Sequence, residues 1–309
     1  MPNDATPHSP AQDIRRARIW LTRAVEPGDI TLHAALTELG PVETARRLAA
    51  SATSEPFPGI AAPHRGLDVV AADLATADQL GIRPVTPDED EWPHQQLQAM
   101  SAAADRGVPG SAPPVALWTH GPARLGELVG RAVAVIGTRA ASPYGTRVAG
   151  DLAYRLAARG WTVISGGGYG IDEAAHRGAL AAGGPTIAVL GSGLRRPYPS
   201  GNASLFADIR RSGLLISEWP PDCVTARQRI LQRTRLIAGL AAAVVIVETL
   251  TTSGAIHTGQ WATTYGRPLL AIPGPVISTA SAGCHLLLQA GKARLVTNTD
   301  QILDAVTTS

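Results

Sequence analysis

A glycine-rich turn near the middle of the chain has the composition of an anion-binding loop. It follows the apolar run Trp161–Ile164 and precedes a helix predicted for residues 171–182. Glycines let backbone N–H groups approach a phosphate without obstruction by Cβ atoms, and a helix N-terminus adds partial positive charge. We therefore predict phosphate binding here, with a tight turn that binds nothing as the alternative. The loop residues are Ser165, Gly166, Gly167, Gly168, Tyr169 and Gly170.

Two further loops carry groups that suit phosphate. Arg139 follows the apolar run Ala132–Ile136, and its planar guanidinium matches a phosphate better than an ammonium would. Ser253 and Gly254 follow the run AVVIVE and open another predicted helix, where a hydroxyl and free N–H groups form a second anion nest. A surface arginine paired with a carboxylate and an ordinary helix cap are the alternatives.

A helix predicted for residues 225–240 is rich in arginine. Arg227, Arg229, Arg233 and Arg235 fall within nine residues, separated by aliphatic side chains. A solvated face of an amphipathic helix is the ordinary explanation of such a run. The density of arginines, with only Asp222 nearby, favours a phosphate track.

Groups suited to acid–base chemistry are few near these loops. They are Asp172, Glu173, His176, Glu218, Glu248 and His257. No Ser-His-Asp order, Cys-His pair or H-E-x-x-H motif is present. The spacing of the glycines is not G-x-G-x-x-G, so a standard nicotinamide site is not expected. We predict no catalysis, no cofactor and no metal site.

The order of elements predicts the fold that positions these loops. From residue 131 onward, short apolar runs alternate with helical patterns, which is typical of a doubly wound, mostly parallel α/β sheet. Parallel strands end at one edge of such a sheet, and open α/β folds bind ligands there. All three candidate loops therefore belong to one edge.

The first part of the chain differs from the rest. We expect a flexible leader over 1–11, a small helical domain over 12–81 and the α/β domain over 82–309, with 51–64 as a loop and 102–114 as an exposed linker. Residues 1–119 carry 9 Lys and Arg against 15 Asp and Glu, whereas residues 120–309 carry 18 against 10. The basic second part suggests an anionic partner. Two distant cysteines and the absence of a long apolar run predict a reduced, cytoplasmic location without a membrane segment.

Ordered motifs in the chain resemble the DNA-processing protein A family, called DprA or Smf. The motifs are VAVIGTRAASPYG, SGGGYGIDEAAHRGAL, TIAVLGSGL, LLISEWPP, RTRLIAGL, VVIVE with a later SG, and IPGPV with a later SAG. They cover roughly residues 115–300. The segments EPGD and ELGPVETARRL are similar to the family's small helical domain, which is SAM-like or helix-hairpin-helix-like.

The resemblance implies an extended Rossmann-like core and a function. Family members bind single-stranded DNA with little sequence preference, form dimers and help load the RecA recombinase in natural transformation. By resemblance, Arg139 grips the DNA backbone beside the glycine loop, and Arg233 and Arg235 fall on the family's R-x-R. We expect no winged-helix domain, which many relatives carry, after residue 309.

The chain departs from the family pattern at several positions, among them Ala255, which replaces the second serine of a serine-glycine-serine element. Tyr169 replaces Lys or Arg, Thr234 replaces Asn, His285 replaces Asn, and Ile230 replaces an aromatic residue that could stack on a base. Two rival hypotheses stay open. One is a nucleotide-binding enzyme or sensor related to cytokinin-activating phosphoribohydrolases, with Glu248 as an acid, although the P-G-G-x-G-T element of that class is missing. The other is an interaction module that acts through dimerisation and its acidic helical part.

Overall fold

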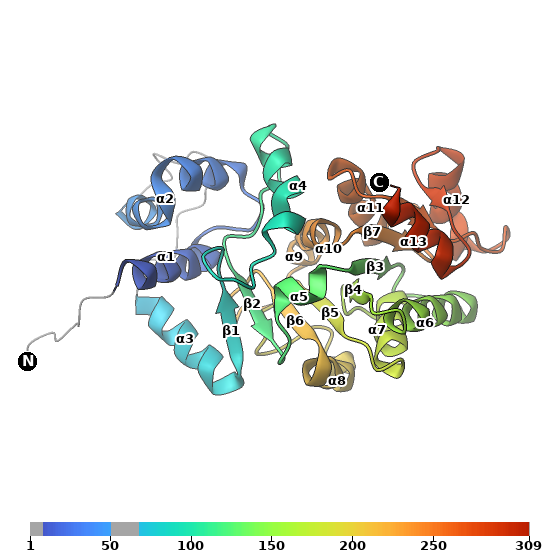
Figure 1. Cartoon of the computed structure of the whole chain (residues 1–309), viewed down its shortest axis with the longest axis horizontal. Helices are drawn as coiled ribbons and strands as arrows, with labels where there is room; N and C mark the ends of the chain where they lie inside the picture. Colours follow the sequence, from blue (N-terminus) through green and yellow to red (C-terminus); the bar gives the residue numbers. More distant parts are fainter. Residues whose placement is uncertain (1–8, 51–67, 309) are drawn as a thin grey trace, which may run out of the picture.

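The computed structural model describes residues 9–50 and 68–308, which form a nine-stranded sheet covered by helices on both faces (Figure 1). The strands are β1 (Ile82–Val85), β2 (Leu117–His120), β3 (Ala132–Ile136), β4 (Thr162–Ser165), β5 (Thr186–Leu190), β6 (Leu214–Ser217), β7 (Ala243–Ile246), β8 (Leu269–Ala271) and β9 (Arg294–Leu295). Their order is β1-β2-β6-β5-β4-β3-β7-β8-β9. The β1–β2 and β2–β6 pairs are antiparallel, and the other pairs are parallel. The predicted doubly wound, mostly parallel sheet is confirmed.

The central strand β3 shows why the parallel strands of this sheet consist almost wholly of apolar residues. Ala134 and Ile136 contribute to the core on one face of the sheet, whereas Val133 and Val135 contribute to the core on the other. A parallel strand covered on both sides needs apolar residues at every position, and all five residues of β3 are buried. Because β4 and β7 flank β3, the chain reverses its direction of winding at this strand.

Helices of the α/β part cover the two faces in separate groups. The first core face contains residues of α4, α5, α10, α11 and α12, and the opposite face contains those of α6, α7 and α13. In chain order, the helices of this part are α4 (His94–Asp105), α5 (Leu125–Val129), α6 (Pro143–Ala157), α7 (Ile171–Ala181), α8 (Ala203–Ser212), α9 (Arg227–Gln232), α10 (Thr234–Leu240), α11 (Gly254–Thr264), α12 (Ala282–Gln289) and α13 (Thr299–Thr307).

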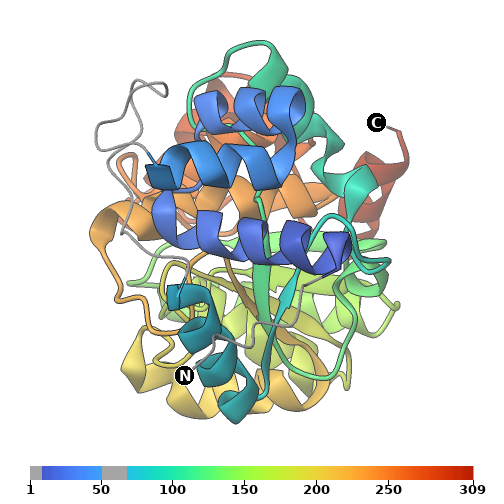
Figure 2. The ribbon, with the colours of Figure 1, turned by 90° about the vertical axis from the view of Figure 1, so that its left-hand side faces the viewer.

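Three helices precede the sheet, and Figure 2 looks onto them. They are α1 (Pro10–Ala24), α2 (Ile30–Ala50) and α3 (Asp68–Leu80). The helix α1 begins one residue after its N-cap Ser9, so residues 10 and 11 are helical rather than part of a leader. Gly40, at φ +74°, divides α2 as the pair Gly40-Pro41 predicts. Residues 1–8 of the expected leader and the expected loop 51–64 lie outside the described residues.

The helical part and the sheet share one hydrophobic core. Trp20 of α1 and Leu48 of α2 belong to the same buried cluster as Trp118 of β2, Leu215 of β6 and Phe206 of α8. The helices therefore need the sheet to bury their apolar faces. None of the helices among the described residues is long and apolar enough to cross a membrane.

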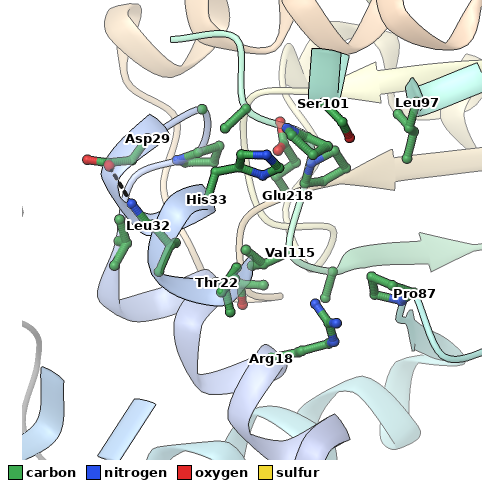
Figure 3. Close-up of a pocket in the computed structure, with 18 of the residues that line it drawn as sticks. Arg18, Thr22, Asp29, Leu32, His33, Pro87, Leu97, Ser101, Val115 and Glu218 are labelled. Carbon is green, nitrogen blue, oxygen red and sulfur yellow. Dashed lines mark hydrogen bonds between the residues drawn. The ribbon is translucent and has the colours of Figure 1, made fainter. Parts of the chain in front are cut away.

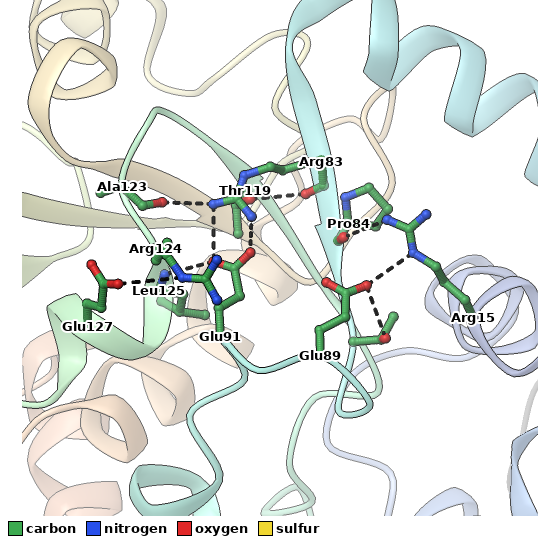
Figure 4. A network of polar contacts seen from close by, with 11 residues as sticks. Arg15, Arg83, Pro84, Glu89, Glu91, Thr119, Ala123, Arg124, Leu125 and Glu127 are labelled. Atoms are coloured by element: carbon green, nitrogen blue, oxygen red, sulfur yellow. Dashed lines mark hydrogen bonds and ion pairs between the residues drawn. The ribbon is translucent and has the colours of Figure 1, made fainter. Parts of the chain in front are cut away.

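An acidic turn after β1 fastens the helical part to the sheet (Figure 4). Arg15 of α1 donates to Glu89 at 3.1 Å, and Arg18 donates to Asp88 at 3.0 Å. Glu91 accepts hydrogen bonds from Arg83 of β1 and, at 3.0 Å, from the N–H of Leu125. The three acidic residues of this turn therefore pair with arginines of the same N-terminal segment.

Two predicted segments differ from the structure. The expected linker over 102–114 is wrong at its start, because α4 extends to Asp105 and buries Met100 and Ala103. The expected single helix over 225–240 is divided at Arg233 into α9 and α10.

His176 of α7 gives the fold a specific acid sensitivity. Its side chain is fully buried, and its Nδ1 lies 2.8 Å from Thr186 Oγ1, which donates its own proton to Val163 O. Nδ1–H is therefore the donor, and Nε2 has no partner among the described residues. Burial, and secondarily the charge of Arg233, lower the pKa of His176 to about 3.

Below pH 6.5 the unfolded chain protonates this imidazole while the native protein does not, so stability decreases as the pH falls. We expect a loss of about 1.4 kcal/mol per pH unit from this group between pH 6 and pH 4. Urea unfolding of His176→Asn should show a correspondingly shallower dependence on pH than the unmodified protein. Equal slopes for the two proteins would contradict the assignment.

Candidate nucleic-acid interface

A cleft of about 880 Å³ opens at the carboxyl ends of β3 and β7. This is the point at which the winding of the sheet reverses, and open α/β folds bind ligands in such crevices. The cleft brings together four of the predicted phosphate-binding residues, Arg139, Arg233, Ser253 and Gly254. Three guanidinium groups line it, those of Arg139, Arg227 and Arg233, against the single carboxylate of Asp172.

Arg139 is exposed on the loop that leaves β3. The segment that follows β7 holds this loop, because Thr138 N–H donates to Glu248 O at 2.7 Å. No hydrogen bond or ion pair engages the Arg139 side chain within the described parts of the chain. Its guanidinium is therefore free to meet an anion in the cleft.

Arg233 forms the inner wall of the cleft and is 93 % buried, with only 7 % of its surface exposed. Its Nη1 donates to the carbonyls of Gly166 and Val189, whereas its Nε has no partner among the described residues. Burial lowers the pKa of Arg233 to about 10, so the side chain is cationic at neutral pH. Asp172 favours this charge and Arg139 opposes it. An anion between the two arginines would relieve that repulsion.

The glycine loop packs directly against the Arg139 loop. Gly170 has φ +75°, and a Cβ there would lie 2.5 Å from the carbonyl oxygens of Thr138 and Arg139. A Cβ on Gly166 would lie 2.7 Å from Arg233 Nη2. Glycine is thus required at Gly166 by the guanidinium and at Gly170 by the neighbouring loop.

Asn202 holds the glycine loop from the opposite side. Its buried Nδ2 donates to Gly167 O at 3.1 Å and to Gly168 O at 3.2 Å. The N–H of Gly168 donates to Asp172 Oδ2 at 3.2 Å, and burial raises the pKa of that carboxyl group. The loop therefore uses some of its polar groups internally. None of residues 165–170 lines the cleft, and only Gly168 borders the small hollow beside Arg139 and Arg233.

Glu248 and Ser253 have structural partners at the end of β7. Glu248 is fully buried and accepts from the N–H of Ser142, the N-cap of α6, at 2.9 Å and also from its hydroxyl. Ser253 precedes α11 without a side-chain cap, and its hydroxyl contacts that of Thr249. The N-terminus of α11 thus faces the cleft beside Ser253 and Gly254.

Seven of the predicted residues do not line the cleft: Gly166, Gly167, Gly168 and Gly170 of the glycine loop, and three whose side chains lie elsewhere. Arg235 is 1 % exposed and pairs with Glu218 and with Ala112 O, so the structure corrects its expected place in the groove. Ser165 is buried, and its hydroxyl donates to Val135 O at 2.7 Å. Tyr169 is exposed on the glycine loop but packs against Gly201 and does not line the cleft. Arg229 also does not line the cleft, because its side chain pairs with Glu26 at 2.8 Å.

Two cleft residues were not among those singled out as binding residues. Tyr198, half-exposed on the loop after β5, borders the cleft and a small hollow shared with Gly168, Arg139 and Arg233. Arg227 was recognised only as part of the arginine run, since its position on the cleft side of α9 depends on where the helix breaks. Ile230, which stands where relatives carry an aromatic residue, also lines the cleft.

Comparison with known proteins places the sequence in a family. The family model for DNA recombination-mediator protein A matches residues 83–307. The putative DNA processing protein DprA of Mycobacterium tuberculosis is 46 % identical over 291 residues, covering 94 % of this chain and 75 % of that protein. Protein Smf of Escherichia coli is 40 % identical over 236 residues, covering 76 % of this chain and 59 % of that protein.

Solved structures agree with the sequence comparison. DprA from Streptococcus pneumoniae superposes with a TM-score of 0.71 at 26 % identity, covering 94 % of this chain and 97 % of that one. DprA from Helicobacter pylori, described for its single-stranded DNA binding mode, gives a TM-score of 0.58 at 30 % identity, covering 63 % and 88 %. The chain belongs to the DNA recombination-mediator protein A family, the DprA/Smf proteins.

Proposed function

We propose that this protein binds single-stranded DNA without strong sequence preference and holds a backbone phosphate between Arg139 and Arg233. The main support is Arg233, a buried guanidinium whose Nε lacks a partner among the described residues and which borders an open cleft. Exposed Arg139 and Arg227 complete a cationic wall around the same space. Charge-assisted hydrogen bonds to phosphate are independent of base identity, so binding of this kind tolerates any sequence.

The relatives support the choice of DNA as the ligand. Several are named DNA processing proteins, and the Helicobacter pylori protein is described as binding single-stranded DNA. We extend this to a cytoplasmic role in natural transformation and recombination, in which the protein forms a homodimer, protects incoming DNA and helps load the RecA recombinase.

We propose no catalytic step. Several groups that suit acid–base chemistry have structural partners: Glu248 with Ser142, Asp172 with Gly168 and His176 with Thr186. His257 lines the cleft without a side-chain hydrogen bond among the described residues. No cluster of three or more His, Cys, Asp or Glu that could hold a metal ion occurs in the described part of the chain.

Fluorescence anisotropy of a labelled oligothymidylate and a matched duplex across a salt series tests the proposal. We expect tighter binding to the single strand and a linear decrease of log K with log salt. Absence of binding at low salt would contradict the proposal. Binding of a free nucleotide in place of DNA would favour the rival nucleotide-binding function.

Tyr198 is the side chain on the cleft best suited to stack on a base. Because stacking is worth about 1–3 kcal/mol per base, we expect Tyr198→Ala to weaken binding of oligothymidylate by roughly fivefold to a hundredfold. Tyr198→Phe should retain most of the affinity, since the ring is kept. An equal loss for the two variants would show that the hydroxyl, not the ring, makes the contact.

A further inference from the structure

A second cavity, separate from the DNA cleft, lies between the helical part and the sheet (Figure 3). It has a volume of about 270 Å³ and shares no lining residue with the cleft. Arg18 and Pro87 lie toward one end in this view, and Leu97 and Ser101 of α4 lie toward the other. The turn between α1 and α2, residues 25–29, and the segment 112–116 supply much of the remaining wall.

The charge of this lining is opposite to that of the cleft. Three carboxylates, those of Glu26, Asp29 and Glu218, face a single guanidinium, that of Arg18. Arg18 is already paired with Asp88 at 3.0 Å. Glu26 and Glu218 are likewise paired, with Arg229 and Arg235, so the choice of a ligand depends on the polar group that is left without a partner.

Most of the polar groups in the lining already have partners. Glu26 accepts from Trp219 Nε1 at 3.0 Å and from Arg229, and Asp29 accepts from the N–H of Leu32 at 2.9 Å. Thr22 donates to Ile19 O. These groups are held by the fold and are not available to a ligand without rearrangement.

Glu218 is different because half of its carboxylate has no partner. Its side chain is 3 % exposed, and Oε1 accepts from Arg235. Oε2 is buried without a hydrogen-bond partner among the described residues. Leaving a buried charged acceptor unsatisfied is costly, and burial raises the pKa of Glu218. A donor carried into the cavity would satisfy this oxygen.

The rest of the lining is suited to an aliphatic stem. Trp92, Leu97 and Ala116 are buried, and Pro113 and Pro114 adjoin them along the segment before β2. The volume lies just below the roughly 300 Å³ at which drug-sized ligand sites begin, so the occupant must be small.

We propose that this cavity binds a small organic cation, a guanidinium or primary ammonium on a short alkyl stem, through Glu218 Oε2. The stem packs among Trp92, Leu97 and the two prolines. The site is independent of the DNA cleft, because neither its charge nor its lining residues contribute to phosphate binding.

Two probes of equal size isolate the role of charge. We expect n-butylguanidinium, titrated into the full chain by NMR or calorimetry, to bind at least tenfold more tightly than neutral n-butylurea, because hydrogen bonds to a charged group contribute about 1.5–3 kcal/mol. Equal affinities, or no binding of butylguanidinium at millimolar concentration, would overturn the proposal.

Variants locate the site. Glu218→Gln should reduce butylguanidinium binding tenfold or more, but it also removes the charge beside Arg235 and can prevent folding. Ser101→Phe leaves that pair intact and fills the cavity from α4, so it should abolish binding in a folded protein. Arg139→Ala, in the other cleft, should leave binding unchanged. Unaltered binding to folded Ser101→Phe would place the cation elsewhere and refute the assignment.

Discussion

Replacing Arg139 by alanine is expected to weaken single-stranded DNA binding by roughly tenfold to a hundredfold for every sequence tested. The side chain borders the cleft, and no partner engages it among the described residues, so its removal costs a charge-assisted contact worth about 1.5–3 kcal/mol without disturbing the fold. The salt dependence should also become shallower by about 0.7, the contribution of one single-strand phosphate. Anisotropy titrations at four or more salt concentrations measure both effects.

Arg155→Ala is the matched control for that change. Arg155 is an exposed arginine in the last turn of α6 and does not line the cleft. The variant has the same change in net charge, so it should retain the affinity and nearly the full salt slope. If the two variants behaved alike, Arg139 would act only through overall charge and the phosphate contact would be refuted.

Replacing Arg235 by alanine is expected to lower the free energy of unfolding by about 3–5 kcal/mol. The change leaves Glu218 as an uncompensated buried carboxylate, and breaking a buried ion pair from one side has costs of this size. Urea unfolding measures the loss. The exposed pair Arg211–Asp208 provides the control, since Arg211→Ala should cost about 1 kcal/mol or less.

A double variant tests whether Arg235, unlike Arg233, contributes to the fold and not to DNA binding. The double variant Arg235→Met with Glu218→Leu removes both charges and should recover much of the stability lost by the single change. If it also retains the affinity and salt slope for DNA, the second arginine of the R-x-R element acts through the fold. A loss of DNA affinity in a stable double variant would contradict this distinction.

Much of the fold could be predicted because parallel strands carry a strong local signal. The strands β5 and β6 fall on two of the short apolar runs that alternate with helical patterns, since runs such as TIAVL fit a strand that is buried on both faces. The helix α4 was missed because its buried residues include Ala103 and Ala104, which are small. Its packing depends on the close approach of Met100 to Gly239 of α10, a contact with no local pattern.

The site could be predicted only in part for a similar reason. The order of strands and loops placed Arg139, the glycine loop and Ser253–Gly254 at one edge, and the arginine run added Arg233. The structure brings Arg139, Arg233, Ser253 and Gly254 together in the cleft but leaves the glycine loop out of its lining. Which arginines of the run 227–235 point into the cleft depends on partners far away in sequence. Glu26 lies about 200 positions before Arg229 and draws it away from the cleft. Glu218 does the same for Arg235, and neither pairing leaves a trace in spacing.

A crystal structure of the protein with a short oligothymidylate would test the central claim most directly. The account predicts a backbone phosphate within hydrogen-bond distance of the guanidinium groups of Arg139 and Arg233, at the carboxyl ends of β3 and β7. Bases should lie toward Tyr198, and Arg235 should remain paired with Glu218. An oligonucleotide bound on another surface, with no phosphate at these two arginines, would contradict the account.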